Sequence, residues 1–194
     1  MQLSIADYYL VVINVLGFIL YIINMLLYKS TKEKHIDPVL TIVTIMAGSL
    51  GIVMAILLFD RKAVKDNMMS RVFVICMLVI QVIGFLFIRG HHTDTITFAF
   101  GEFLGRNKML LFYLLAINIV TFAAFALDKI AALEGDRRIQ IITLLGLAFI
   151  GGSLGGLIAM YLFRHKIRKD YFTVGIPLIL IMQIIVLFYL MNIG

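Results

Sequence analysis

The sequence predicts an all-α integral membrane protein with six transmembrane helices, arranged as two inverted three-helix repeats. Three observations predict this fold: the composition, six long apolar runs and an internal repeat. Of the 194 residues, 62% are hydrophobic and 14% are charged, and the mean hydropathy is +1.06. So few polar residues cannot cover a soluble domain of this size. Each span should be helical, because lipid offers the backbone no hydrogen-bonding partner and the alternation of a membrane barrel is missing.

Six apolar runs have the length of a membrane span, which needs about 20 residues to cross about 30 Å of hydrocarbon. The first run has no basic residue before it and begins beside Asp7, which is unlike a cleaved signal peptide, so we expect it to remain as a span. The predicted spans are Tyr9 to Tyr28, Pro38 to Phe59, Val72 to Ile88, Leu110 to Leu127, Ile139 to Phe163 and Thr173 to Met191.

An internal repeat divides the chain. The segment 150–169, IGGSLGGLIAMYLFRHKIRK, is matched without a net gap by the segment 46–65, MAGSLGIVMAILLFDRKAVK. Around these segments about a quarter of the aligned positions are identical, against about a tenth expected by chance. The sequence therefore predicts a diverged three-helix repeat over 1–89, a linker over 90–108 and a second repeat over 109–194.

The number of spans sets the predicted geometry of the repeats. Three spans are an odd number, so the second repeat should enter the membrane from the opposite side and be inverted. This arrangement places Asp128 across the membrane from Arg164. It also divides the basic residues almost evenly between the two faces, with a small excess favouring both termini outside. We expect a multi-pass protein of the bacterial inner membrane.

Small residues occupy the middle of the second and fifth runs. Their spacing is typical of helices whose backbones pack closely. The alternative is a substrate path between these helices, with the two serines as hydroxyl groups at the membrane midplane. The candidates are Gly48, Ser49 and Gly51 in the first repeat and Gly151, Gly152, Ser153, Gly155 and Gly156 in the second.

Amide side chains form a second set of candidates. Asn14 and Asn118 lie about two turns inside the first helix of each repeat, where they could bond a neighbouring helix or contact a ligand. Gln81 and Gln183 occupy comparable places in the third helices, so the interior should be polar but uncharged. All acidic residues lie near span ends or in loops, which argues against a proton-coupled exporter of cations.

Basic clusters follow the central run of each repeat, and cations at this depth can hold phosphate groups. The alternative is topogenic charge with snorkelling side chains. The candidates for binding a substrate or lipid are Arg164, His165, Lys166 and Lys169, their counterparts Arg61, Lys62 and Lys65, and the pair Asp128 and Lys129.

Neither a metal nor a cofactor is expected. His91 and His92 are adjacent, so they cannot share one helical face, and no third ligand follows at a defined spacing. Cys76 is the only cysteine, which excludes an intrachain disulfide. The expected partners are membrane lipids, and a second copy of the chain in a homodimer is a further option. Nothing indicates nucleic-acid binding.

Three motifs in the second half carry a resemblance to a known family. They are FALDKIAA (125–132), LLGLAFIGGSLGGLIAM (144–160) and FRHKIRKDYF (163–172). In this order they resemble the bacterial membrane proteins of domain-of-unknown-function family 1294. The first half matches only through its Gly-Ser-Leu-Gly and basic segments, with Asn24 at the position of Asp128. The resemblance implies a membrane protein and marks these motif residues, but it implies no reaction.

Three functions remain open from the sequence. The first is a small transporter, channel or lipid-translocating protein for an anionic or zwitterionic substrate. The second is a non-catalytic membrane scaffold or subunit that binds partner helices or anionic lipid. The third is an enzyme acting on lipid through Asp128, His165 and Arg164, which the predicted placement of Asp128 and Arg164 on opposite faces disfavours. An enzyme is therefore not the expected function.

Overall fold

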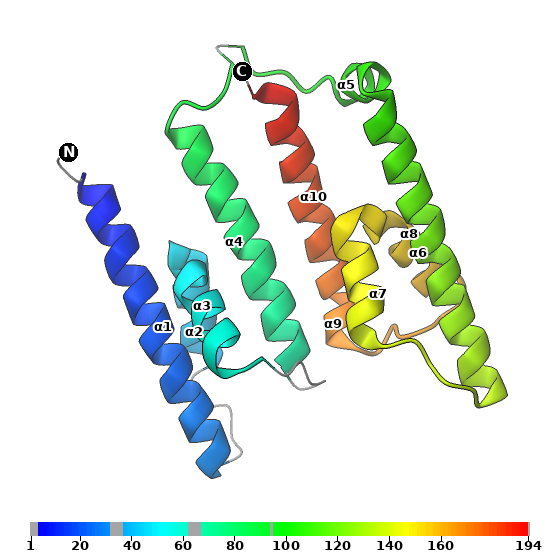
Figure 1. Ribbon diagram of the computed structural model, residues 1–194, viewed down its shortest axis with the longest axis horizontal. Coiled ribbons are helices and arrows are strands. Elements are labelled where there is room, and N and C mark those ends of the chain that lie inside the picture. The colour runs from blue at the N-terminus through cyan, green and yellow to red at the C-terminus, as the bar shows by residue number, and fades with distance from the viewer. Residues whose placement is uncertain (1–3, 32–36, 62–66, 94, 194) are drawn as a thin grey trace. The chain divides into compact units, whose positions relative to one another are not determined.

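The computed structural model describes residues 4–31, 37–61, 67–93 and 95–193, shown as a ribbon in Figure 1. The described residues form helices joined by turns and irregular segments, and the chain divides into two compact units, Met1–Val82 and Ile83–Gly194. Six helical segments are long and apolar enough to cross a membrane, as the sequence predicts for a multi-pass membrane protein. They are Ile5–Tyr28, Asp37–Phe59, Met68–Ile88, Lys108–Glu134, Ile141–Leu162 and Asp170–Asn192.

The first unit combines two long helices with a helical hairpin (Figure 1). The long helices are α1 (Ile5–Thr31) and α4 (Met68–Ile88), whose last residues belong to the second unit. Between them the chain forms α2 (Asp37–Val43), the tip segment η1 (Thr44–Gly48) and α3 (Ser49–Phe59). A core of apolar side chains holds these elements together, namely Ile13, Leu40, Val43, Ile52, Ile56 and Val74.

Hydrogen bonds to α1 show that α2 and α3 fold back on each other. Asp37, at the start of α2, accepts a bond of 3.0 Å from Asn24. Asp60, just after α3, accepts a bond of 2.8 Å from Tyr21. Tyr21 and Asn24 are less than one helical turn apart. Both ends of the hairpin therefore lie at the same end of α1.

The second unit has the same organisation after a short helix, α5 (Phe100–Arg106). Its long helices are α6 (Lys108–Glu134) and α10 (Gly175–Asn192), the latter preceded by the single turn α9 (Asp170–Thr173). Its hairpin consists of α7 (Ile141–Leu147), the tip segment η3 (Ala148–Gly152) and α8 (Ser153–Leu162).

One carboxylate marks both ends of this second hairpin. The backbone N–H of Ile139, just before α7, donates to Asp128 Oδ1 over 2.9 Å. The imidazole Nε2 of His165, just after α8, lies 2.7 Å from Asp128 Oδ2. The tip turns at Gly151, whose φ of 132° lies in the region that favours glycine. The chain thus leaves the Asp128 end of α6, reverses at η3 and returns.

The hairpins correct one prediction about the second and fifth apolar runs. These runs have the length and composition of spans, but each is folded in half around its tip. The prediction that Asp128 and Arg164 lie on opposite membrane faces is wrong, because His165, next to Arg164, contacts Asp128. Length alone cannot separate one full crossing from two half crossings. The count of three crossings per repeat, on which the inverted arrangement was based, therefore loses its support.

Candidate functional site

The hairpin tip of the second unit is tied to α6 by an asparagine. A reversal inside a helix frees backbone groups that must find other partners in an apolar environment. Asn118 Nδ2 donates to the carbonyl oxygen of Gly151 over 2.9 Å. Its Oδ1 accepts a bond of 2.7 Å from the backbone N–H of Gly155. One amide thus satisfies one group on each side of the turn.

A glutamine from α10 completes the same tip. Gln183 Nε2 donates to the carbonyl oxygens of Ala148 and Phe149, over 2.7 and 2.9 Å. The hydroxyl of Ser153 donates to Gln183 Oε1. These bonds join the hairpin to the long helices on both of its sides, and they bring the predicted amides to the central serine and glycines.

The first unit makes equivalent contacts, with its asparagine and tip residues 104 residues earlier in the chain and its glutamine 102 residues earlier. Asn14 bonds the carbonyl oxygen of Ala47 and the N–H of Gly51, over 3.0 and 2.8 Å. Gln81 bonds Ser49 and the carbonyl oxygen of Thr44. The two tips therefore share one hydrogen-bonding scheme.

The central glycines pack closely against the neighbouring long helix. A Cβ built on Gly155 would lie 2.1 Å from the carbonyl oxygen of Asn118, and one on Gly51 would lie 1.8 Å from that of Asn14. A Cβ on Gly152 would lie 1.9 Å from Thr121 Oγ1. The space that a side chain at these positions would need is thus occupied by the neighbouring long helix. This geometry is that of close helix packing, the first of the two readings of the small-residue pattern. The remaining candidates here, Gly48, Ser49, Gly151, Ser153 and Gly156, are also buried.

Replacing Asn118 with leucine should destabilise the protein by about 2 kcal/mol, because the carbonyl oxygen of Gly151 and the N–H of Gly155 each lose a partner in a dry interior. Asn14→Leu should cost a similar amount in the first unit. Thermal unfolding in detergent measures both. A melting temperature unchanged by either substitution would show that the tips do not depend on these amides.

Asp128 is the centre of a buried charged cluster. The residue is 0% exposed, and its Oδ2 lies 2.7 Å from both His165 Nε2 and Lys166 Nζ. The ammonium group of Lys166 also lies 4.8 Å from the centre of the Phe172 ring. Burial lowers the pKa of Lys166 below its ordinary value, and the Asp128 carboxylate opposes this shift. Asp128 and Lys166 therefore form a compensated buried ion pair.

The cluster fixes the loop that follows α8. Arg164 and Lys166 adopt positive φ values of 45° and 63°, which non-glycine residues rarely do. Lys166 and His165 are drawn inward to Asp128, while Arg164 and Lys169 are exposed and Lys129 is half-buried. Among the predicted residues of the second unit, the structure thus brings together Asp128, His165 and Lys166 and leaves Arg164 and Lys169 at the surface.

The first unit has a different cluster at the corresponding end. Its carboxylate is Asp60, which stands at the position of Arg164 and accepts bonds from Tyr21, at 2.8 Å, and Asn67, at 3.2 Å. Arg71 pairs with Asp60 at 3.1 Å. Arg61 is exposed, and its Nε donates to the carbonyl oxygen of Leu57. The predicted candidates Lys62 and Lys65 lie outside the described residues.

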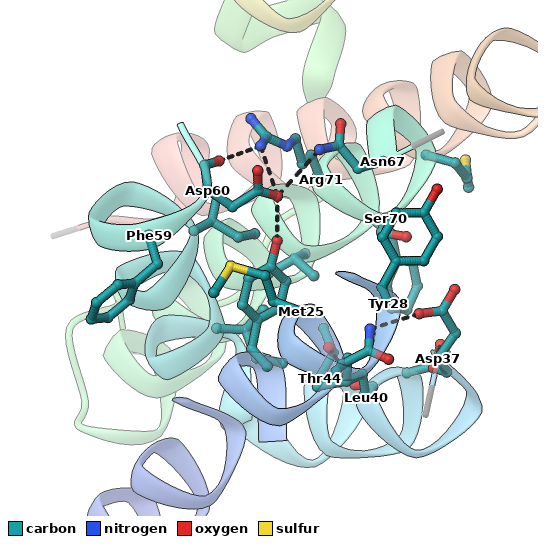
Figure 2. A pocket seen from close by; sticks show the side chains of 18 of the residues that line it. Met25, Tyr28, Asp37, Leu40, Thr44, Phe59, Asp60, Asn67, Ser70 and Arg71 are labelled. Carbon is teal, nitrogen blue, oxygen red and sulfur yellow. Dashed lines mark hydrogen bonds and ion pairs between the residues drawn. The ribbon is translucent and has the colours of Figure 1, made fainter. Parts of the chain in front are cut away.

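Next to the Asp60 cluster lies a partly open pocket of about 810 Å³, lined by α1, both arms of the hairpin and the start of α4 (Figure 2). Asp60, Asn67 and Arg71 gather on one side of it, while Asp37 and Thr44 lie on another (Figure 2). Its walls combine polar and apolar side chains. The polar ones are Tyr21, Asn24, Tyr28, Asp37, Thr41, Thr44, Asp60, Arg61, Asn67, Ser70 and Arg71, and the apolar ones include Met25, Leu40, Ile52, Ile56, Phe73 and Val74.

Asn24, one of the residues that line this pocket, has an unused acceptor. Its Nδ2 donates to Asp37 over 3.0 Å, whereas its Oδ1 is buried and has no hydrogen-bond partner among the described residues. A buried acceptor without a partner costs about 1–3 kcal/mol. A ligand donor that reaches this oxygen, after a small movement of the amide or of its neighbours, would remove this cost.

At the equivalent positions the second unit is filled by aromatic side chains. Ser70 corresponds to Phe172 by the spacing that relates Gln81 to Gln183, and Tyr21 corresponds to Phe125 by the spacing of the repeat. Phe125 and Phe172 are 0% exposed, and their rings pack edge to face at 5.6 Å. The pocket of the first unit is therefore not a general consequence of the hairpin architecture.

Sequence reasoning missed the pocket, whose polar residues were not among the candidates except for Arg61. From the sequence alone, Asn67, Ser70 and Arg71 have no assigned role, and the aspartates are placed only as acidic residues near span ends or in loops. The available signal was the difference between the repeats: a serine where the second half has Phe172, and an amide where it has Asp128.

Comparisons with known proteins agree with the resemblance in the second half. The family described as "Protein of unknown function (DUF1294)" matches residues 118–172, which contain the contacts of Asn118 with the hairpin tip and the Asp128 cluster. The uncharacterized protein YsdA of Bacillus subtilis (strain 168) is 35% identical over 75 residues, which cover 39% of this chain and 84% of YsdA. No solved structure matches the chain. With this relative matched over most of its length, the chain belongs to the DUF1294 family.

Proposed function

We propose that this protein binds an amphipathic molecule with a zwitterionic or anionic headgroup and moves it across the bacterial cell membrane. The pocket of the first unit carries the proposal. It lies among elements long and apolar enough for a membrane, and it combines groups of both charges with apolar walls. Such a lining suits a molecule that is polar at one end and apolar at the other.

The hairpin beside the pocket supports this function. Interrupted helices are tolerated at membrane depth where protein surrounds them or where they line a cavity, and transporters place binding sites beside them. Both arms of the α2–α3 hairpin contribute to the pocket. A shift of either arm would therefore change access to a bound molecule.

We also propose that the two repeats come from an internal duplication and have the same direction in the membrane. In each unit the long helices cross and the hairpin returns to the side from which it starts, so a repeat crosses an even number of times. By chain order, all but three of the 17 basic residues then fall on the side of the hairpin ends, the exceptions being Arg89, Arg106 and Lys108. The positive-inside rule makes this side cytoplasmic and puts both termini outside.

Single-cysteine labelling tests this topology. In a Cys76→Ala background, an impermeant maleimide applied to intact cells should label Lys108→Cys but neither Arg61→Cys nor Arg168→Cys. The latter two should react only after the membrane is opened, because both follow hairpin arms. All three positions are exposed in the protein. Labelling of Arg61→Cys and Arg168→Cys from opposite sides would instead support inverted repeats.

Reconstituted vesicles test the movement itself. Vesicles containing the protein should equilibrate a fluorescent phospholipid between leaflets faster than protein-free vesicles. If no anionic or zwitterionic lipid or solute moves, and a membrane protein co-purifies at a fixed ratio, the scaffold function replaces this proposal.

A further inference from the structure

We infer that the pocket of the first unit is a binding site for a zwitterionic phospholipid headgroup that carries a primary ammonium group. The inference names the substrate class of the proposed function, but binding itself does not depend on whether the molecule is moved. It rests on the pocket's charge, its unused acceptor, its size and its contrast with the second unit.

The charged side chains of the pocket favour a ligand without net charge. Among the described residues that line the pocket, two carboxylates, Asp37 and Asp60, are matched in formal charge by two guanidinium groups, Arg61 and Arg71. The Asp60–Arg71 pair is partly buried, with side chains 26% and 12% exposed. A net anionic headgroup would add uncompensated charge beside this pair, whereas a zwitterion can set its phosphate toward the arginines and its cation toward Asp37.

The unused acceptor favours an ammonium over a methylated cation. Asn24 Oδ1 is buried with no hydrogen-bond partner among the described residues, and its amide nitrogen is bonded to Asp37. A primary ammonium has three N–H donors and can serve both the amide oxygen and the nearby carboxylate. A quaternary ammonium has no N–H and would leave the amide oxygen unsatisfied.

The size and walls of the pocket fit a headgroup together with the first part of its chains. The volume of about 810 Å³ lies within the usual range of small-molecule sites. Leu40, Ile56, Phe73 and Val74 supply apolar wall beside the polar groups. A whole two-chain lipid would not fit, so its chains must extend into the surrounding bilayer.

The second unit shows how the same fold closes this space. Phe172 stands where the first unit has Ser70, and it is fully buried against Phe125. Ser70→Phe therefore introduces into the pocket a side chain that the same architecture accommodates at the equivalent position. Thr143→Phe, at an exposed position on α7, adds the same ring away from the pocket and is the matched control.

The experiment is native mass spectrometry of the delipidated full-length protein titrated with phosphatidylethanolamine, phosphatidylcholine or phosphatidylglycerol. The unsubstituted protein and Thr143→Phe should retain phosphatidylethanolamine about tenfold more strongly than the other two lipids. Ser70→Phe should lose this preference. Asn24→Leu, which removes the acceptor without filling the pocket, should lower the affinity for phosphatidylethanolamine about tenfold, as expected for one lost hydrogen bond to a charged donor.

Several results would overturn the inference. They are equal retention of all three lipids, a preference for phosphatidylglycerol, or unchanged retention in Ser70→Phe and Asn24→Leu. If Ser70→Phe does not fold, Asn24→Leu alone decides. Selective binding of phosphatidylethanolamine without movement in vesicles would refute the proposed function and leave the site standing. Movement that Ser70→Phe does not slow, with no selective binding, would refute the site and leave the movement standing.

Discussion

Gly155→Ala should destabilise the protein by about 3 kcal/mol or more, and the variant should accumulate poorly in the membrane. The added Cβ would lie 2.1 Å from the carbonyl oxygen of Asn118 and 2.8 Å from its carbonyl carbon. Both atoms belong to the backbone of α6, so no rotamer change can relieve the overlap, and α8 must move away. That movement also breaks the bond between Asn118 and the N–H of Gly155. The melting temperature in detergent measures the effect.

Gly146→Ala is the matched control for this substitution. Gly146 lies on α7 of the same hairpin, and a Cβ there would meet no atom within 4 Å. Alanine should stabilise this helical position by about 0.5–1 kcal/mol relative to glycine. A melting temperature that falls equally in both variants would mean that α8 does not pack against α6 in this way.

Asp128→Asn should have the second large effect and lower the free energy of unfolding by about 3–5 kcal/mol. The substitution keeps the size of the side chain but removes the negative charge beside Lys166 Nζ, whose side chain is only 9% exposed. An ammonium group buried without a counter-charge is strongly unfavourable. Lys129→Met, which removes the half-buried neighbouring cation of α6, should change stability much less.

A second substitution and a change of pH separate the charge effect from a general packing defect. Adding Lys166→Met to Asp128→Asn should recover part of the loss, because both charges are then absent. Burial lowers the pKa of Lys166 in the folded protein below its ordinary value of 10.5. At pH values between the folded-state pKa and this ordinary value, the unfolded chain therefore binds more protons than the folded protein. The free energy of unfolding of Asp128→Asn should therefore rise as the pH rises through this window. Equal stability of the single and double variants at every pH would contradict the role of the pair.

The sequence was sufficient to predict the long helices and to single out the polar and small residues that meet at the tips. The apolar runs matched the helical segments, and the paired amides and small residues recur at the two hairpin tips. Those features are local: span length follows from hydropathy, and tight packing follows from missing side chains. The Phe-Arg-His-Lys motif also carries the resemblance to the family at the level of sequence alone.

The reversal of the hairpins could not be derived from span length. A run of about 22 apolar residues satisfies the requirement for one crossing as well as for two half crossings. The distinguishing information is tertiary, since it consists of the bonds from Asp128 to Ile139 and to His165. A pattern on α6 was available as a hint, because Asn118, Thr121, Phe125 and Asp128 fall on one helical face with three polar side chains. The pocket depends on packing differences that only coordinates reveal.

The spacing of the hairpin contacts has a consequence for biosynthesis. Tyr113 bonds Ile150, Asn118 bonds Gly155, and Asp128 bonds His165, each pair being 37 residues apart. Contacts so close in sequence can form while the chain is still attached to the ribosome, before α10 has been made. The hairpin can thus assemble against α6 as it leaves the insertion machinery, and its freed polar groups need not wait in lipid for a distant partner. Each unit would then fold as a nascent module, in the order of its synthesis.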